Sequence, residues 1–338
     1  MKIYFSLFIM VLLITAGCQP RTQPPGKKIE EKSMLLLGGE NQYVEITGEN
    51  DAAPVLLFIH GGPGWPQTPM LRYFNKDLTK KYIVVSWDQR GCGKSYMNNP
   101  NPGNMTLQQV VSDAHELTAY LKKKFGDNRS IYLAGFSWGS IVGMELAQKY
   151  PSDYEAYIAI SQVISLTKGT QVAREWLGEE AKKANDTATL NTLAKLNAKD
   201  TSFCKSDLDC FIQQSKLISK YKGDVFNDTM YAAEEKAMKA YDDYKNYDWE
   251  KGFEFSARHF EKDMFAADFS DVGQLEIPVY FLAGKNDWQV PSIITQAFYD
   301  NFSAPEKKIF WFKNTGHNIP EEAAAEFNDI LIHKILKQ

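Results

Sequence analysis

Residues 135–139 read GFSWG, and at their centre Ser137 has the surroundings of a nucleophile. A short apolar run, 131–134, comes directly before them, and a segment with helical spacing, about 139–149, follows. In a tight turn from a strand to a helix, a serine between two glycines is lifted above the sheet edge with its hydroxyl exposed. Gly-x-Ser-x-Gly alone is a weak motif, but this context predicts Ser137 as a catalytic nucleophile.

A serine hydroxyl attacks a carbonyl only when a base removes its proton. Among five histidines, His317 lies in the polar loop Asn-Thr-Gly-His that follows the last apolar run, 308–312. From such a loop it can reach a serine at the same edge of a sheet, so His317 is the predicted base. The other four suit structural or surface positions: His60 in a glycine-rich loop, His115 and His333 in helical segments, and His259 in a helical insert.

An imidazole base needs an acid that fixes its tautomer and stabilises its protonated form. Asp287 follows the apolar run 278–282 in the segment AGKNDW, again at the end of an expected strand. Its alternative role is to cap the helix that opens after Pro291. The order serine, aspartate, histidine along the chain is that of α/β-hydrolase triads, which favours the catalytic role.

A glycine-rich segment, HGGPG at 60–64, follows another apolar run, 54–59. Such a loop lets backbone N–H groups face the carbonyl under attack and stabilise the oxyanion. The expected donors are the amides of Gly62 and Trp138. For His60, holding this loop by hydrogen bonds is a simpler role than acting as a second base.

Apolar runs alternate with helical segments over most of the chain, which predicts a mostly parallel sheet with helices on both faces. Segments 34–37 and 42–46 flank a Gly-Gly turn and predict an opening hairpin. The fold class we expect is an α/β-hydrolase fold with about eight strands. Residues 34–161 and 272–338 would form the core, and 162–271 a helical lid inserted between the sixth and seventh strands.

The N-terminal residues do not fit the core pattern. Residues 1–17 read as a signal peptide, because a mostly apolar run from 4 to 14 is too short to span a membrane. The sequence TAGC resembles the bacterial lipobox, which implies lipid attachment at Cys18; an ordinary signal peptide is the alternative. Residues 18–33, polar and proline-rich, would be a tether. The protein would then be anchored to a membrane outside the cytoplasm, in a bacterial cell envelope.

Composition and cysteine spacing limit the partners. The net charge of −4 argues against nucleic acid as a main partner, because nucleic-acid-binding proteins usually carry an excess of basic residues. Outside the cytoplasm a disulfide is permitted, and Cys204 with Cys210 is the plausible local pair; two free thiols are the alternative. Zinc has too few neighbouring ligands there, and Cys92 would stay unpaired and buried.

Five segments together resemble the prolyl aminopeptidase (proline iminopeptidase) branch of the α/β-hydrolases. They are HGGPG at 60–64, DQRGCGKS at 88–95, GFSWGS at 135–140, Asp287, and Gly-His at 316–317. The resemblance implies a serine aminopeptidase that releases N-terminal residues from short peptides, with no metal or organic cofactor, and a structural role for 88–95. In that branch, lid glutamates bind the substrate's amino group; the candidates here are Glu175, Glu234, Glu235, Glu250, Glu254 and Glu261.

Two other functions remain open from the sequence. The same machinery could serve a carboxylesterase or small-amide hydrolase, with the lid shaped for an apolar acyl group. Residues 231–269 contain ten aromatic side chains, which would either line such a pocket or pack the lid onto the core. The third possibility is a surface lipoprotein that binds a ligand without catalysis.

Overall fold

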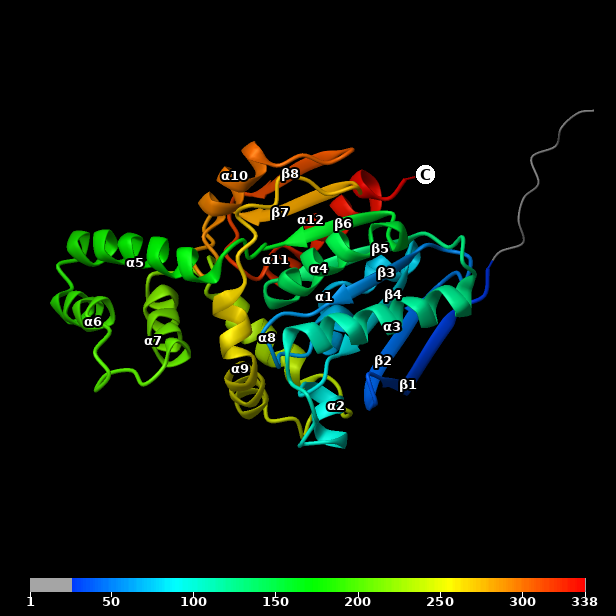
Figure 1. Cartoon of the computed structure of the whole chain (residues 1–338), viewed down its shortest axis with the longest axis horizontal. Helices are drawn as coiled ribbons and strands as arrows, with labels where there is room; N and C mark the ends of the chain where they lie inside the picture. The colour runs from blue at the N-terminus through cyan, green and yellow to red at the C-terminus, as the bar shows by residue number, and fades with distance from the viewer. Residues whose placement is uncertain (1–25, 338) are drawn as a thin grey trace, which may run out of the picture.

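Short apolar segments form one eight-stranded sheet in the computed structural model, which describes residues 26–337 (Figure 1). Its spatial order is β1-β2-β4-β3-β5-β6-β7-β8, and every pair beyond β4 is parallel, as the sequence predicts. Strands β3 to β7 are buried on both faces, which explains their continuous apolar runs. The strands are β1 (Ile29–Leu37), β2 (Glu40–Gly48), β3 (Val55–Ile59), β4 (Ile83–Asp88), β5 (Ile131–Phe136), β6 (Ala156–Ile160), β7 (Val279–Gly284) and β8 (Lys307–Phe312).

The first strand begins earlier than the sequence predicts, so the expected tether of 18–33 is too long. Residues 29–33 already belong to β1 and pair antiparallel with β2, from Ile29 opposite Gly48 onward. β1 is an edge strand in which half-buried and exposed side chains alternate, and Glu30 and Lys32 occupy its exposed face. A polar stretch can therefore be a strand here. The hairpin itself, with its Gly38-Gly39 turn, is confirmed.

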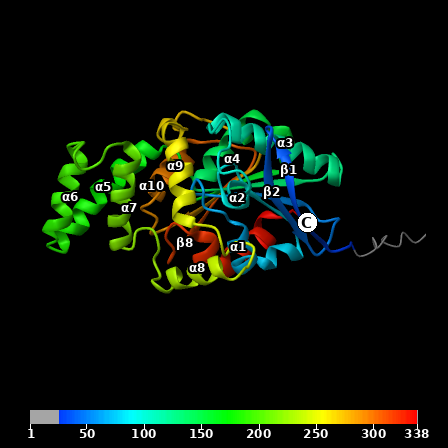
Figure 2. The ribbon, with the colours of Figure 1, turned by 90° about the horizontal axis from the view of Figure 1, so that it is seen from below.

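Helices cover both faces of the sheet (Figures 1 and 2). One face is packed by α3, α4 and α10, and the other by α1, α12 and the turn that follows it. Each face has its own cluster of buried apolar residues, so the sheet is packed on both sides. The core helices are α1 (Thr68–Phe74), α2 (Gly93–Asn98), α3 (Leu107–Phe125), α4 (Trp138–Lys149), α10 (Ser292–Asn301), α11 (Ile319–Glu322) and α12 (Ala324–Ile330).

Five helices lie between β6 and β7 and form the insert. In both views α5, α6 and α7 project beyond the sheet, whereas α8 and α9 return along the core (Figures 1 and 2). In the insert, buried Leu177, Leu193 and Ile218 form a small apolar cluster of their own. The insert helices are α5 (Leu166–Lys183), α6 (Thr187–Asn197), α7 (Asp207–Lys220), α8 (Thr229–Lys239) and α9 (Trp249–Ala266).

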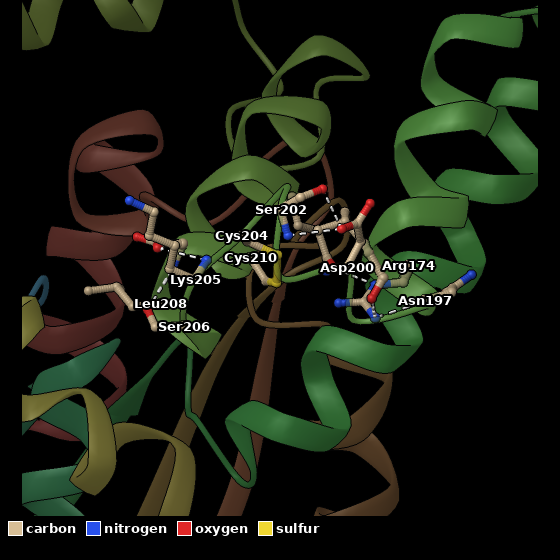
Figure 3. Close-up of a disulfide and its surroundings, with 12 residues drawn as sticks. Arg174, Asn197, Asp200, Ser202, Cys204, Lys205, Ser206, Leu208 and Cys210 are labelled. Carbon is tan, nitrogen blue, oxygen red and sulfur yellow. Dashed lines mark hydrogen bonds between the residues drawn. A yellow bond between two sulfur atoms is a disulfide. The ribbon is translucent and has the colours of Figure 1, made fainter.

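A disulfide joins Cys204 to Cys210, which confirms the predicted pair (Figure 3). Cys204 lies in the loop before α7 and Cys210 in its first turn, so the bond links the beginning of this helix to the loop that precedes it. Ser206 lies between them and accepts a hydrogen bond from the Asp209 backbone as the N-cap of α7. Cys92 is buried and unpaired, as expected.

The predicted signal peptide, 1–17, and Cys18 lie outside the described residues. Within 26–337, none of the helices has the length and apolar character needed to cross a bilayer.

Candidate active site

Ser137 occupies a strained turn between β5 and α4. Its φ of 52° and ψ of −118° are rare for a residue with a side chain. The glycines on either side permit the turn, because a Cβ at Gly139 would collide with the Ile59 carbonyl, and one at Gly135 would lie 2.6 Å from the Gly139 carbonyl. The turn therefore has the geometry of a nucleophile elbow.

The three residues selected from the sequence meet at this edge of the sheet. Nε2 of His317 lies 2.9 Å from Oγ of Ser137, and Nδ1 lies 2.9 Å from Oδ2 of Asp287. With Nδ1–H donated to the buried carboxylate, Nε2 is the acceptor for the serine proton. The other oxygen of Asp287 accepts the backbone N–H of Val290 at 2.8 Å. One oxygen of Asp287 therefore holds the turn before α10 and the other holds the imidazole; the N-cap of α10 itself is Pro291, which forms no side-chain cap hydrogen bond.

The expected oxyanion donors line the same cavity as Ser137. Gly62 belongs to the loop after β3, and its φ of 105° is accessible mainly to glycine. Trp138 is the first residue of α4, so no carbonyl one turn earlier accepts its N–H. Both backbone groups are positioned beside the nucleophile from opposite loops.

His60 and Gln89 connect these two loops and do not touch the hydroxyl. Nδ1 of His60 donates to the Gly61 carbonyl at 2.7 Å, and Nε2 accepts the Gln89 backbone N–H at 3.2 Å. Burial lowers the pKa of His60 to about 4, so this ring is neutral. The Gln89 side chain donates to the His60 carbonyl and accepts from the indole of Trp138. Within 88–95, Gln89 therefore supports the elbow through hydrogen bonds to His60 and Trp138.

A cavity of about 410 Å³ opens over Ser137. The insert supplies much of its wall, chiefly from α7, α8 and α9, and apolar side chains cover the side formed by Val163, Leu166, Phe211 and Met264. Of the ten aromatic residues in 231–269, only Phe253 lines the cavity. Most of the others pack the insert onto the core, for example Tyr244, whose hydroxyl donates to Asp88 at 2.7 Å.

Glu234, on α8, is the one carboxylate among the residues that line the cavity. The side-chain amide of Asn318, directly after His317, donates to it at 2.6 Å. Burial is the main cause that raises the pKa of Glu234 to about 7. The remaining five glutamate candidates do not line the cavity; Glu235 on the same helix, for example, pairs with Lys239 in solvent. Sequence spacing alone could not separate these six.

A second carboxyl, Glu321 on α11, lies behind this wall and was missed from the sequence. It accepts a hydrogen bond from the side chain of Gln67, which itself lines the cavity. Its other oxygen, Oε2, has no hydrogen-bond partner among residues 26–337. Burial, with a smaller contribution from Glu234, raises the pKa of Glu321 to about 8. Glu321 is therefore neutral at neutral pH.

The segment 223–224 of the insert is bonded directly to the loops that carry the acid and the base. The carbonyl of Gly223 accepts the backbone N–H of Trp288, and that of Asp224 accepts the backbone N–H of His317, both at 2.6 Å. The insert thus positions the two loops as well as the cavity wall.

The sheet order and the turn at Ser137 define an α/β-hydrolase fold. More narrowly, the chain belongs to the serine aminopeptidase family S33, whose model matches residues 55–324. A Bacillus subtilis (strain 168) protein named probable aminopeptidase YbaC is 30% identical over 314 residues, which cover 91% of this chain and 97% of that protein. A proline iminopeptidase of Neisseria gonorrhoeae is 32% identical over 138 residues, 40% of each chain.

Solved structures show the same fold with different activities. A proline iminopeptidase of Mycobacterium smegmatis superposes with a TM-score of 0.61 at 20% identity, over 90% of this chain and 96% of that one. An esterase of Exiguobacterium antarcticum gives 0.59 at 16% identity, over 89% and 98%. At these identities the likeness establishes the fold alone. The protein is a hydrolase of this family, and its substrate must be argued from the cavity.

Proposed function

We propose that the protein is a serine aminopeptidase that releases the N-terminal residue of short peptides. The observation that carries this proposal is Glu234, the single carboxylate in the wall of the cavity that contains Ser137. A carboxylate in a partly buried site favours a cation, and the free amino group of a peptide is a cation near neutral pH. The 91% coverage by a relative named a probable aminopeptidase supports the same conclusion.

The reaction follows from the hydrogen-bonded line of side chains. Oγ of Ser137 forms a bond to the peptide carbonyl carbon while its proton passes to Nε2 of His317. The amides of Gly62 and Trp138 stabilise the oxyanion. The C–N bond then breaks, and His317 gives the proton to the leaving amine. Water, deprotonated by His317, hydrolyses the acyl-enzyme and frees the N-terminal amino acid, while Asp287 stabilises the protonated imidazole throughout.

The test compares aminoacyl and simple acyl substrates. We expect proline and alanine p-nitroanilides to be hydrolysed, and Ser137→Ala to abolish the turnover without changing the fold. Glu234→Gln should raise KM for the anilides about tenfold or more, because it removes one charge-assisted hydrogen bond, and leave p-nitrophenyl acetate almost unaffected. Glu235→Gln, on the same helix but in solvent, is the matched control. Hydrolysis of esters with no release of an N-terminal residue would refute the peptidase proposal.

A carboxylesterase is the second candidate, favoured by the apolar side of the cavity at Val163, Leu166 and Met264. It predicts that KM for p-nitrophenyl esters falls as the acyl chain lengthens, and that Glu234→Gln has no effect on any good substrate. For a binding protein without catalysis, a fluorophosphonate probe would not label Ser137.

The proposed location is the cell envelope, with a lipid on Cys18. This rests on the TAGC sequence at 15–18 and the polar residues that follow it. Metabolic labelling with a radioactive or clickable fatty acid should mark the full chain and not its Cys18→Ser variant. Recovery of the unaltered chain in the aqueous phase after detergent partition would contradict the anchor.

A further inference from the structure

Lys216 is the one ammonium group among the residues that line the active-site cavity. It lies on α7 between Ile212 and Ser219, which also line the cavity, and these positions share one face of a helix. Its side chain is exposed to solvent, whereas that of Glu234 is half-buried. The wall of the cavity thus contains a half-buried carboxyl group and a solvent-exposed ammonium group.

No ion pair within residues 26–337 involves Lys216. The next lysine of the helix, Lys220, is bonded to Asp186 outside the cavity. The other polar groups of this wall are engaged: Ser215 accepts from Gln289 at 3.0 Å, and Ser219 donates to Asp224. The charge of Lys216 is therefore available to a ligand.

The helix that carries Lys216 is connected to the loop of the base, His317. Ser219, about 4.5 Å further along the helix axis, bonds to Asp224, whose carbonyl holds the backbone of His317. His317 must lie beside the leaving nitrogen because it gives that nitrogen its proton. A group attached close to the leaving nitrogen therefore lies near His317, in the same cavity whose wall contains Lys216.

From this arrangement we propose that Lys216 binds the free carboxylate of the residue being released, so that the preferred substrates are dipeptides. In a dipeptide a single α-carbon separates the scissile nitrogen from the carboxylate, and a longer peptide carries its carboxylate farther away. The ammonium group of the dipeptide then binds Glu234 and its carboxylate binds Lys216. The two side chains thus match the two charges of a zwitterion. The inference rests on the aminopeptidase function proposed above and adds its substrate class.

The experiment compares a dipeptide with its C-terminal amide, for example Pro-Gly and Pro-glycinamide, with the N-terminal residue chosen from the anilide screen. For the unaltered protein we expect kcat/KM to favour the free acid roughly fivefold, mainly through KM. Lys216→Met should bring the ratio close to one, Lys216→Glu should invert it, and Lys216→Arg should retain it. Lys220→Met is the matched control and should leave the ratio unchanged.

Added salt should reduce the preference in the unaltered protein, because the charge is exposed at the opening. A ratio that is the same in the unaltered protein and in Lys216→Met and Lys216→Glu would overturn the carboxylate role while leaving the aminopeptidase proposal intact. If neither peptide is cleaved while p-nitrophenyl acetate is, both proposals are overturned. A purely structural role of Lys216 would change both substrates equally and would leave the ratio where it was.

Discussion

Replacing Glu321 by glutamine tests whether the buried carboxyl behind the cavity is protonated. Glu321 is only 6% exposed, accepts from Gln67 with one oxygen and leaves the other without a partner. Its pKa of about 8 in the folded state compares with 4.5 in the absence of burial. Between these values the folded chain binds one more proton than the unfolded chain, so the free energy of unfolding falls as pH rises.

The size of the effect follows from the two pKa values. Each unit of difference corresponds to about 1.4 kcal/mol, so between about pH 5 and pH 8 the wild type loses roughly 4 kcal/mol that the glutamine variant keeps. Glutamine has the same shape, still accepts from Gln67 and does not titrate. Relative to the wild type, the variant should therefore gain roughly 5 °C in Tm over this range.

The assay is urea and thermal denaturation of both proteins at several pH values from 5 to 8. Glu326→Gln, an exposed acid on the next helix, is the control and should follow the wild type. If the difference in unfolding free energy between wild type and Glu321→Gln is the same at pH 5 and pH 8, the carboxyl is already ionised and the reasoning is wrong.

Three further predictions concern the elbow, the amine-binding carboxylate and the disulfide. Gly139→Ala places a methyl group against the Ile59 carbonyl and should cost about 2 kcal/mol in urea denaturation, with weaker fluorophosphonate labelling; an unchanged midpoint would contradict the close approach. Because the pKa of Glu234 is about 7, KM for aminoacyl anilides should fall from pH 6 to 7.5 as this group ionises, while KM for an ester stays level; parallel curves would exclude Glu234 from amine binding. Replacing Cys204 and Cys210 by serine should lower the unfolding free energy by about 2 kcal/mol, and no loss would show that the bond does not constrain the unfolded chain.

The reactive residues could be predicted from the sequence because their signals are local. Ser137, Asp287 and His317 each lie within a few residues of the end of a strand, and parallel strands bring such loops to one edge. The strands themselves are continuous apolar runs because they are buried on both faces. The start of β1 was missed for the opposite reason: at a sheet edge, Glu30 and Lys32 can be exposed within a strand.

The cavity wall could not be predicted because it depends on long-range packing. Glu234 and Glu235 are neighbours on one helix, and only the placement of α8 relative to Asn318 turns the first one inward. Near the C-terminus, the chain forms two short helices, α11 and α12, with a break at Ala323. Glu321 lies in the first of these short helices, where it is buried and accepts a hydrogen bond from Gln67.

In the proposed function, the insert contributes to the choice of substrate, and its segment 223–224 also contributes to the geometry of the reactive groups. Glu234 and Lys216, which would bind the two ends of a dipeptide, come from the insert, whereas Ser137 comes from the core. The charged groups of the cavity wall proposed to select the substrate therefore belong to the insert. Segment 223–224, however, accepts hydrogen bonds through its backbone carbonyls from the loops of His317 and Trp288. A substitution of a side chain in this segment would keep these bonds. A displacement of its backbone would break them. Substrate preference can thus vary through side chains on α7 and α8 without disturbing the alignment of base and nucleophile, provided that the path of the chain between these helices is retained.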